Sequence, residues 1–173
     1  GCRGQDGSLL CKSLLKKKYC VIGITRDSSK EVSNHYLLGI NQDIQIKECE
    51  ITSLIGLVKL ISDEYPDQIY NLAAQSSVGK SFDHPKETIE SIVNGTVNIL
   101  EACRTINYNG KLFFAGSSEI FGNTEIGADI NHRQSPISPY AIAKQTSLNL
   151  VKFYREIHNL KCYTGILFNH ESP

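Results

Sequence analysis

The chain has 173 residues, enough for one domain with a sizeable hydrophobic core. Its 18 Lys and Arg residues balance 18 Asp and Glu residues, which argues against nucleic acid or an anionic membrane surface as a partner. No segment approaches the length of a membrane span, and no signal peptide is visible.

The six cysteines are widely spaced and include no C-x-x-C pair, and the histidines lack ligand spacing. We therefore expect reduced thiols in a cytoplasmic protein and no metal site. The chain contains no methionine and starts on glycine, so we also expect it to be a fragment of a longer protein.

Alternating helices and strands are predicted along the chain from hydrophobic periodicity, turn residues and caps. In the first half of the chain we predict a helix over 7–18, a strand over 19–25, a loop over 26–42, a strand over 44–51 and a helix capped by Thr52 and ended by Pro66. In the second half we predict a strand over 68–73, a loop over 75–85, a helix over 85–106, a strand over 111–117, a helix over 138–159 and a strand over 162–168.

This alternation predicts an α/β fold: a Rossmann-like, doubly wound parallel sheet with helices on both faces. The strand that should precede Gly1 is absent, so we expect a gap in the sheet. Ligands of such folds lie beyond the carboxyl ends of the strands. Three polar segments occupy such ends: residues 73–76, 117–119 and 169–171.

Glycines at positions 1, 4 and 7 precede an amphipathic helix. A G-x-x-G-x-x-G turn lets the backbone approach a pyrophosphate, which then sits against the N–H groups of the helix N-terminus. Arg26 follows the next strand, where a dinucleotide ribose lies, and an arginine there suits the 2′-phosphate of NADP. Asp27 beside it weakens this inference, and a plain loop charge is the alternative.

Tyr140 and Lys144 are four residues apart on a predicted helix and so share one face. A lysine ammonium near a phenol favours the phenolate and lowers the tyrosine pKa, which makes a usable base. Ser117 precedes this pair at a strand end. Together with the glycine-rich loop, these residues resemble the extended, nucleotide-sugar-modifying branch of the short-chain dehydrogenase/reductase superfamily.

Five motifs resemble the GDP-mannose 4,6-dehydratase family in the family's own order: GQDGS (4–8), NLAAQSSVGKSF (71–82), SSEIFG (117–122), SPYAIAK (138–144) and GILFNHESP (165–173). The resemblance implies one NADP-binding domain over residues 1–173, truncated at both ends, with the substrate domain to follow. It also implies a hydro-lyase of GDP-fucose biosynthesis that turns GDP-mannose into a 4-keto-6-deoxy sugar, and a homo-oligomer (dimer or tetramer).

The resemblance and the strand-end positions together suggest these site residues. The catalytic candidates are Ser117, Glu119, Tyr140 and Lys144. The cofactor-binding candidates are Gly1, Gly4, Gln5, Asp6, Gly7, Arg26, Glu50, Ile51, Leu72, Ala73, Ala74, Gln75, Tyr140 and Lys144. The substrate-binding candidates are Ser76, Ser117, Glu119 and Asn169.

Glu119 is expected to act on the sugar with Ser117, because side chains two apart on a strand point to one face. Ser117 would orient the 4-oxygen, and Glu119 would serve as the base and acid for the elimination. Two other readings remain: a nucleotide-sugar epimerase or 4-reductase, which needs no acid at position 119, and a non-catalytic cofactor-binding remnant.

Some residues depart from the family pattern. Arg3 stands where a threonine is usual, and it either perturbs the phosphate turn or places its charge near the pyrophosphate. Glu50 replaces an aspartate near the adenine, and Ser77 replaces a histidine. Apolar residues on more than one face of helices 85–106 and 138–159 suit either a subunit interface or burial within one subunit.

Overall fold

The computed structural model describes residues 1–29 and 33–171. Its elements are, in chain order, α1 (Gln5–Lys16), β1 (Ile22–Thr25), α2 (Ser33–Leu37), β2 (Gln45–Glu48), α3 (Leu54–Glu64), β3 (Gln68–Asn71), α4 (Val78–Asp83), α5 (Pro85–Ile89), a π-helical turn (Glu90–Asn94), α6 (Gly95–Thr105), β4 (Lys111–Ser117), a 3₁₀ turn (Ser118–Phe121), α7 (Pro139–Ile157) and β5 (Cys162–Leu167).

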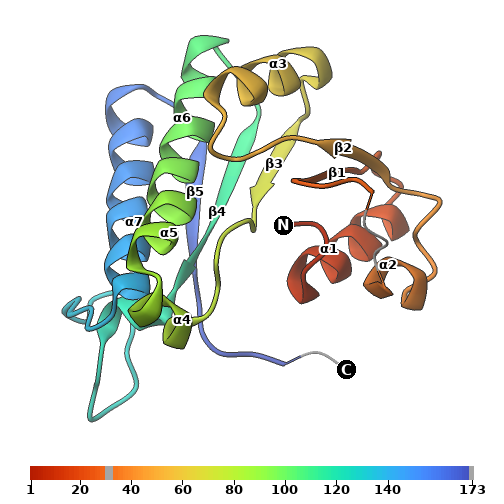
Figure 1. The fold of residues 1–173 in the computed structure, drawn as a ribbon. Coiled ribbons are helices and arrows are strands. Elements are labelled where there is room, and N and C mark those ends of the chain that lie inside the picture. Colours follow the sequence, from red (N-terminus) through yellow and green to blue (C-terminus); the bar gives the residue numbers. More distant parts are fainter. Residues whose placement is uncertain (30–32, 172–173) are drawn as a thin grey trace.

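The strands form two parallel sheets. One has the order β1-β2, with Ile22 opposite Gln45, and the other has the order β3-β4-β5. In the larger sheet Phe114 stands between Asn71 and Thr164. The N-terminus lies between the two sheets (Figure 1). The predicted α/β class is confirmed, and the break between β1 and β3 matches the expected gap.

A single large core lies between the β3-β4-β5 sheet and the helices α3, α6 and α7. Alternate residues of β4, Leu112 and Phe114, are buried against these helices, as the period of two requires. Leu100 of α6 and Val151 of α7 are fully buried there. Burial within one subunit therefore explains these two apolar residues, and they are not interface residues.

The opposite face of the three-stranded sheet carries an aromatic row, Tyr70, Phe113 and Tyr163, which the strand register places side by side. Tyr70 and Tyr163 are exposed. In the part of the chain that the structure describes, the large helical core lies on the other face only. A smaller core joins α1 to the β1-β2 sheet, where Cys11 packs with Val21.

Several local predictions were wrong. The predicted loop over 26–42 contains α2, although its residues 30–32 lie outside the described residues, and the predicted loop over 75–85 contains α4. Ser77 caps α4, because its hydroxyl accepts a hydrogen bond from the Lys80 N–H. Ser53, not Thr52, caps α3 in the same way through the Gly56 N–H. Helix 85–106 is interrupted by the π-helical turn.

The π-helical turn supports the start of α7. The carbonyl of Ile92 accepts hydrogen bonds from the Thr96 hydroxyl, at 2.7 Å, and from the Ser147 hydroxyl of α7, at 3.3 Å. Ile92 is 1% exposed and packs with Tyr140 and Ala143. The turn therefore fixes the position of Tyr140 beside the end of β4.

Candidate active site

The end of β4 positions two of the candidate catalytic side chains. Ser117 is the last residue of the strand, and its hydroxyl accepts a hydrogen bond from the Glu119 N–H at 3.3 Å. This bond starts the 3₁₀ turn that carries Glu119, so Glu119 does not lie on the strand as expected. The turn ends at Gly122, where both the φ of +66° and the 2.2 Å at which a Cβ would meet the Ser135 carbonyl oxygen require glycine.

The first two turns of α7 supply the other two side chains. Ser138 caps the helix by accepting a hydrogen bond from the Ala141 N–H at 3.1 Å, and Pro139 occupies the first helical position. Tyr140 and Lys144 are each 8% exposed. The Lys144 Nζ lies 5.6 Å from the centroid of the Tyr140 ring.

Ser117, Glu119 and Tyr140 act on one another electrostatically. Burial raises the pKa of Tyr140, and a hydrogen bond with the Ser117 hydroxyl opposes that rise. The nearby charge of Glu119 raises the same pKa further, because a negative neighbour disfavours the phenolate. The strand end and the helix start therefore bring these three side chains together.

The hydrogen-bond partner of Lys144 differs from the one that the sequence predicted, which was the region of the Tyr140 phenol. Its ammonium donates a hydrogen bond to the Ala115 carbonyl of β4 at 2.7 Å, and burial lowers its pKa to about 8. The expected lowering of the Tyr140 pKa by Lys144 is not found in this arrangement. The physical reason is that Tyr140 is buried and that the lysine is held by a backbone carbonyl.

The glycine-rich loop is closely packed against β3. A Cβ on Gly1 would lie 2.2 Å from the Leu72 carbonyl oxygen, and a Cβ on Gly7 would lie 2.1 Å from the Gly1 carbonyl oxygen. No side chain caps the N-terminus of α1, which begins after Gly4. The free N–H groups of its first turn, including those of Gln5 and Asp6, form a ready site for a phosphate anion.

The remaining cofactor candidates fall into two groups. The backbone of Leu72 and Ala73 lies against Gly1. The Gln75 amide instead donates to the Ser77 carbonyl at 2.8 Å and to the Thr88 hydroxyl, so it braces α4 and α5. Ala74 packs in the cluster around Ile92.

Near the end of β2, Glu50 is exposed, whereas Ile51 packs against Gly95 and accepts a hydrogen bond from Asn98 at 3.3 Å. Arg26 is exposed at the end of β1. Ser76 and Asn169 are exposed, and within the described residues neither makes a side-chain hydrogen bond.

An ion pair that the sequence did not indicate joins the two ends of the described chain. His170 Nε2 lies 3.0 Å from Asp6 Oδ1, at the start of α1. The Phe168 carbonyl, which binds Nδ1 of His170, and the Asp6 carboxylate both raise the pKa of His170. His170 and Asp6 therefore have a structural partner in each other.

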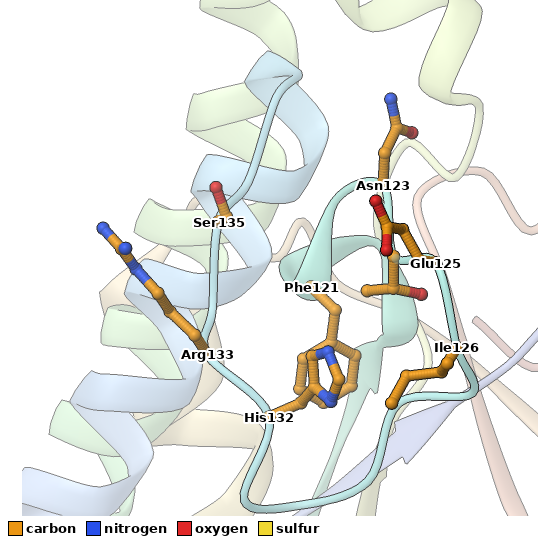
Figure 2. Close-up of a pocket in the computed structure, with 8 residues that line it drawn as sticks. Phe121, Asn123, Glu125, Ile126, His132, Arg133 and Ser135 are labelled. Carbon is orange, nitrogen blue, oxygen red and sulfur yellow. The ribbon is translucent and has the colours of Figure 1, made fainter.

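A pocket of about 360 Å³ lies beyond Glu119 in the segment that links β4 to α7. Figure 2 shows the rings of Phe121 and His132 lying against each other in it, while Arg133 extends away from them. None of the candidate catalytic side chains lines this pocket. The pocket and the set of candidate catalytic residues therefore share no residue.

Three other findings concern the residues that the structure describes. None of their helices is both long and apolar enough to cross a membrane. No group of three or more His, Cys, Asp or Glu side chains among them is placed to hold a metal ion. All six cysteines are free thiols.

Comparison with known proteins gives one family. Residues 1–173 match the family model described as GDP-mannose 4,6 dehydratase. The chain is 36% identical over 193 residues to a GDP-mannose 4,6-dehydratase of Yersinia enterocolitica, with 100% of this chain and 49% of that protein covered. It is 39% identical over 185 residues to one of Drosophila melanogaster, covering 100% of this chain and 46% of that protein. The chain thus spans about half the length of these relatives.

Solved structures share the fold. The UDP-glucose 4-epimerase of Brucella ovis in complex with NAD has a TM-score of 0.87 and 24% identity, with 98% of this chain and 50% of that chain covered. The dTDP-glucose 4,6-dehydratase DesIV of Streptomyces venezuelae, with NAD bound, has a TM-score of 0.83 and 22% identity, with 95% and 52% covered. At these identities the likeness concerns the fold alone.

Proposed function

The chain belongs to the GDP-mannose 4,6-dehydratase family, and on that premise we propose that the full-length protein removes water from GDP-mannose to give a 4-keto-6-deoxy sugar nucleotide. The observation that carries the proposal is the convergence of Glu119 with Ser117 and Tyr140. An oxidation followed by an elimination needs two kinds of group side by side. The hydroxyls of Ser117 and Tyr140 would act on the 4-oxygen of the sugar, and the Glu119 carboxylate would act at carbons 5 and 6.

We infer that the cofactor is a dinucleotide, because the closely packed glycine loop and the uncapped N-terminus of α1 fit a pyrophosphate. We infer NADP rather than NAD because Arg26, exposed at the end of β1, suits a 2′-phosphate. The residues that would hold it are Gly1, Gly4, Gln5, Asp6 and Gly7 at the pyrophosphate, Arg26 at the 2′-phosphate, Glu50 and Ile51 at the adenine, and Leu72, Ala73, Ala74, Gln75 and Lys144 along the remaining length. When bound, this group would supply the acceptor for the hydride of carbon 4 and the source of the hydride for carbon 6.

Tyr140 would take the proton of the 4-hydroxyl. The Ser117 hydroxyl donates toward the Tyr140 oxygen and so favours the phenolate, and it would orient the 4-oxygen of the sugar. The Lys144 ammonium, which the Ala115 carbonyl holds 5.6 Å from the centroid of the Tyr140 ring, would bind the nicotinamide ribose rather than lower the Tyr140 pKa. Because the pKa of Tyr140 is raised, the phenol would first have to release its own proton to solvent before it can accept the proton of the 4-hydroxyl.

Glu119 would carry out the elimination. A carbonyl at position 4 makes the proton on carbon 5 acidic, and the carboxylate removes it. The electron pair of that C–H bond forms the new double bond as the C6–O bond breaks. Glu119 then gives its proton to the departing 6-hydroxyl, which leaves as water. Ser76 and Asn169, both exposed, are proposed contacts for the sugar or diphosphate.

Assembly and location are part of the proposal. Six free thiols suit the reducing cytoplasm. Phe153 and Ile142 on α7 and Ile89 on α5 are exposed, which supports pairing of these helices in a homo-oligomer.

The experiment is to incubate the full-length protein with GDP-mannose and NADP and to analyse the sugar nucleotide by mass spectrometry. A product that has lost one water is expected, and Tyr140→Phe should give none. Inversion at carbon 4 without loss of water would contradict the dehydratase proposal and favour an epimerase.

A further inference from the structure

Arg3 has an unusual position for an arginine, inside the glycine-rich loop. In its side chain, Nη1 donates a hydrogen bond to the Asp27 carbonyl at 2.6 Å, just beyond the end of β1. The Arg3 carbonyl accepts a hydrogen bond from the Asn34 amide of α2 at 3.1 Å, which fixes the backbone from which the side chain extends. The guanidinium is therefore held at the carboxyl end of β1.

The guanidinium retains donors that the described residues do not use. Its Nε is buried without a hydrogen-bond partner, and only Nη1 makes a hydrogen bond. A guanidinium presents five N–H donors in a planar fork, and a buried donor that lacks an acceptor is destabilising. An external anion cannot reach the buried Nε, but Nη2 is not buried and has no hydrogen-bond partner among the described residues. The most favourable partner for these remaining donors is an anion with several oxygens, such as a phosphate.

The turn after β1 already points its N–H groups at anionic oxygens. Ser28 donates from its backbone N–H, at 3.0 Å, and from its hydroxyl, at 2.8 Å, to one carboxylate oxygen of Glu48. Ser29 donates in the same two ways to Asp27 Oδ1, at 3.0 Å and 2.5 Å. These carboxylates thus have serine partners, and neither makes a described ion pair with Arg3.

We propose that Arg3 is a second arginine for the ribose 2′-phosphate of NADP, acting beside Arg26. The inference rests on the proposed function, because it assumes that a dinucleotide lies against the glycine loop with its ribose at the end of β1. A 2′-phosphate carries more than one negative charge, and Arg26 stands directly beside Asp27. A second guanidinium anchored on the Asp27 backbone offsets that carboxylate and makes the site selective for the phosphorylated ribose.

The test uses the full-length protein and two small probes, 2′,5′-ADP and 5′-ADP, titrated by calorimetry. Arg3→Gln is expected to weaken 2′,5′-ADP by roughly tenfold or more, the usual effect of losing a hydrogen bond to a charged group. The affinity for 5′-ADP should stay within about twofold. Arg133→Gln, which changes an exposed arginine away from β1, is the matched control and should alter neither affinity.

Three outcomes would overturn the inference. An equal loss for both probes would mean that Arg3 only supports the turn at Asp27. If Arg3→Gln lowers the affinity for neither probe while Arg26→Gln lowers it for 2′,5′-ADP alone, Arg3 has no role at the 2′-phosphate, and the proposed cofactor still stands. Failure of the unsubstituted protein to bind either probe or any dinucleotide would overturn the proposed function as well.

A second measurement needs no variant, and so does not depend on the folding of Arg3→Gln. Phenylglyoxal modifies accessible guanidinium groups, and the modified arginines can be identified by peptide mass spectrometry. We expect 2′,5′-ADP to protect Arg3 and 5′-ADP not to protect it. Equal protection by both probes, or by neither, would contradict a role at the 2′-phosphate.

Discussion

Replacement of Lys144 by methionine should stabilise the protein at neutral pH while abolishing turnover. Lys144 is 8% exposed, and burial lowers its pKa from 10.5 to about 8. This difference corresponds to about 3 kcal/mol, because one pKa unit is about 1.4 kcal/mol. The hydrogen bond from Nζ to the Ala115 carbonyl offsets about 1–2 kcal/mol of it. Lys144→Met should therefore gain about 1–2 kcal/mol at pH 7.

The sign of the pH dependence follows from the lowered pKa. Between about pH 8 and 10.5 the unfolded chain binds more protons at Lys144 than the folded chain does, so the stability of the unsubstituted protein rises with pH. Above the unfolded pKa this gain is complete, and it is lost as the pH falls through 8. The advantage of Lys144→Met should accordingly shrink from pH 7 to pH 10.

Urea unfolding of both proteins at pH 7 and pH 10 measures this difference. With the usual slope of about 1–3 kcal/mol per molar urea, the midpoint at pH 7 should rise by roughly 0.3–2 M in Lys144→Met. The reasoning would be refuted if Lys144→Met were less stable at pH 7 by an amount that does not change with pH. The Ala115 carbonyl would then fully compensate the buried charge.

Two further predictions concern packing and ionisation elsewhere. Gly7→Ala puts a Cβ 2.1 Å from the Gly1 carbonyl oxygen, so it should cost about 1–3 kcal/mol in thermal unfolding and weaken NADP binding. Gly4→Ala, whose Cβ would meet that oxygen at 3.7 Å, is the matched control and should leave stability nearly unchanged; equal effects would contradict the steric account. The Glu101 pKa is lowered to about 2, mainly by its bonds from Arg104, so this pair stabilises above pH 4.5 and loses its effect as the pH falls toward 2. Because the Glu101 side chain is 26% exposed, Glu101→Gln should cost only about 1 kcal/mol at pH 7, and no cost at pH 7 by thermal unfolding would contradict this account.

The architecture and the meeting of Ser117 with Tyr140 were predictable from the sequence. A strongly apolar strand that ends in polar residues, followed by a capped helix, leaves little freedom in where these elements begin and end. Parallel packing then brings the strand end and the helix start together. The G-x-x-G-x-x-G pattern likewise predicted a tight loop at the start of α1. The structure gives the reason, because a side chain at position 7 would collide with the Gly1 carbonyl oxygen.

Other features depend on tertiary contacts that leave no periodic signal. α4 has six residues, so its helical form rests on the Ser77 cap and packing rather than on a hydrophobic repeat. The bond from Lys144 to the Ala115 carbonyl depends on how closely α7 approaches β4. The 3₁₀ turn that carries Glu119 depends on the bond from the Glu119 N–H to the Ser117 hydroxyl. The direction of the Arg3 side chain depends on the turn after β1 and could not be read from its position among glycines.

The most direct test of the account is the turnover of GDP-mannose by Glu119→Gln in the full-length protein. Glutamine keeps nearly the same shape but cannot take the proton from carbon 5, so GDP-mannose should still bind. General acid–base groups contribute on the order of 10²–10⁴-fold, and dehydration should fall by about that factor. If Glu119→Gln instead removes water at the rate of the unsubstituted protein, Glu119 is a bystander at the end of β4 and the proposed elimination is wrong.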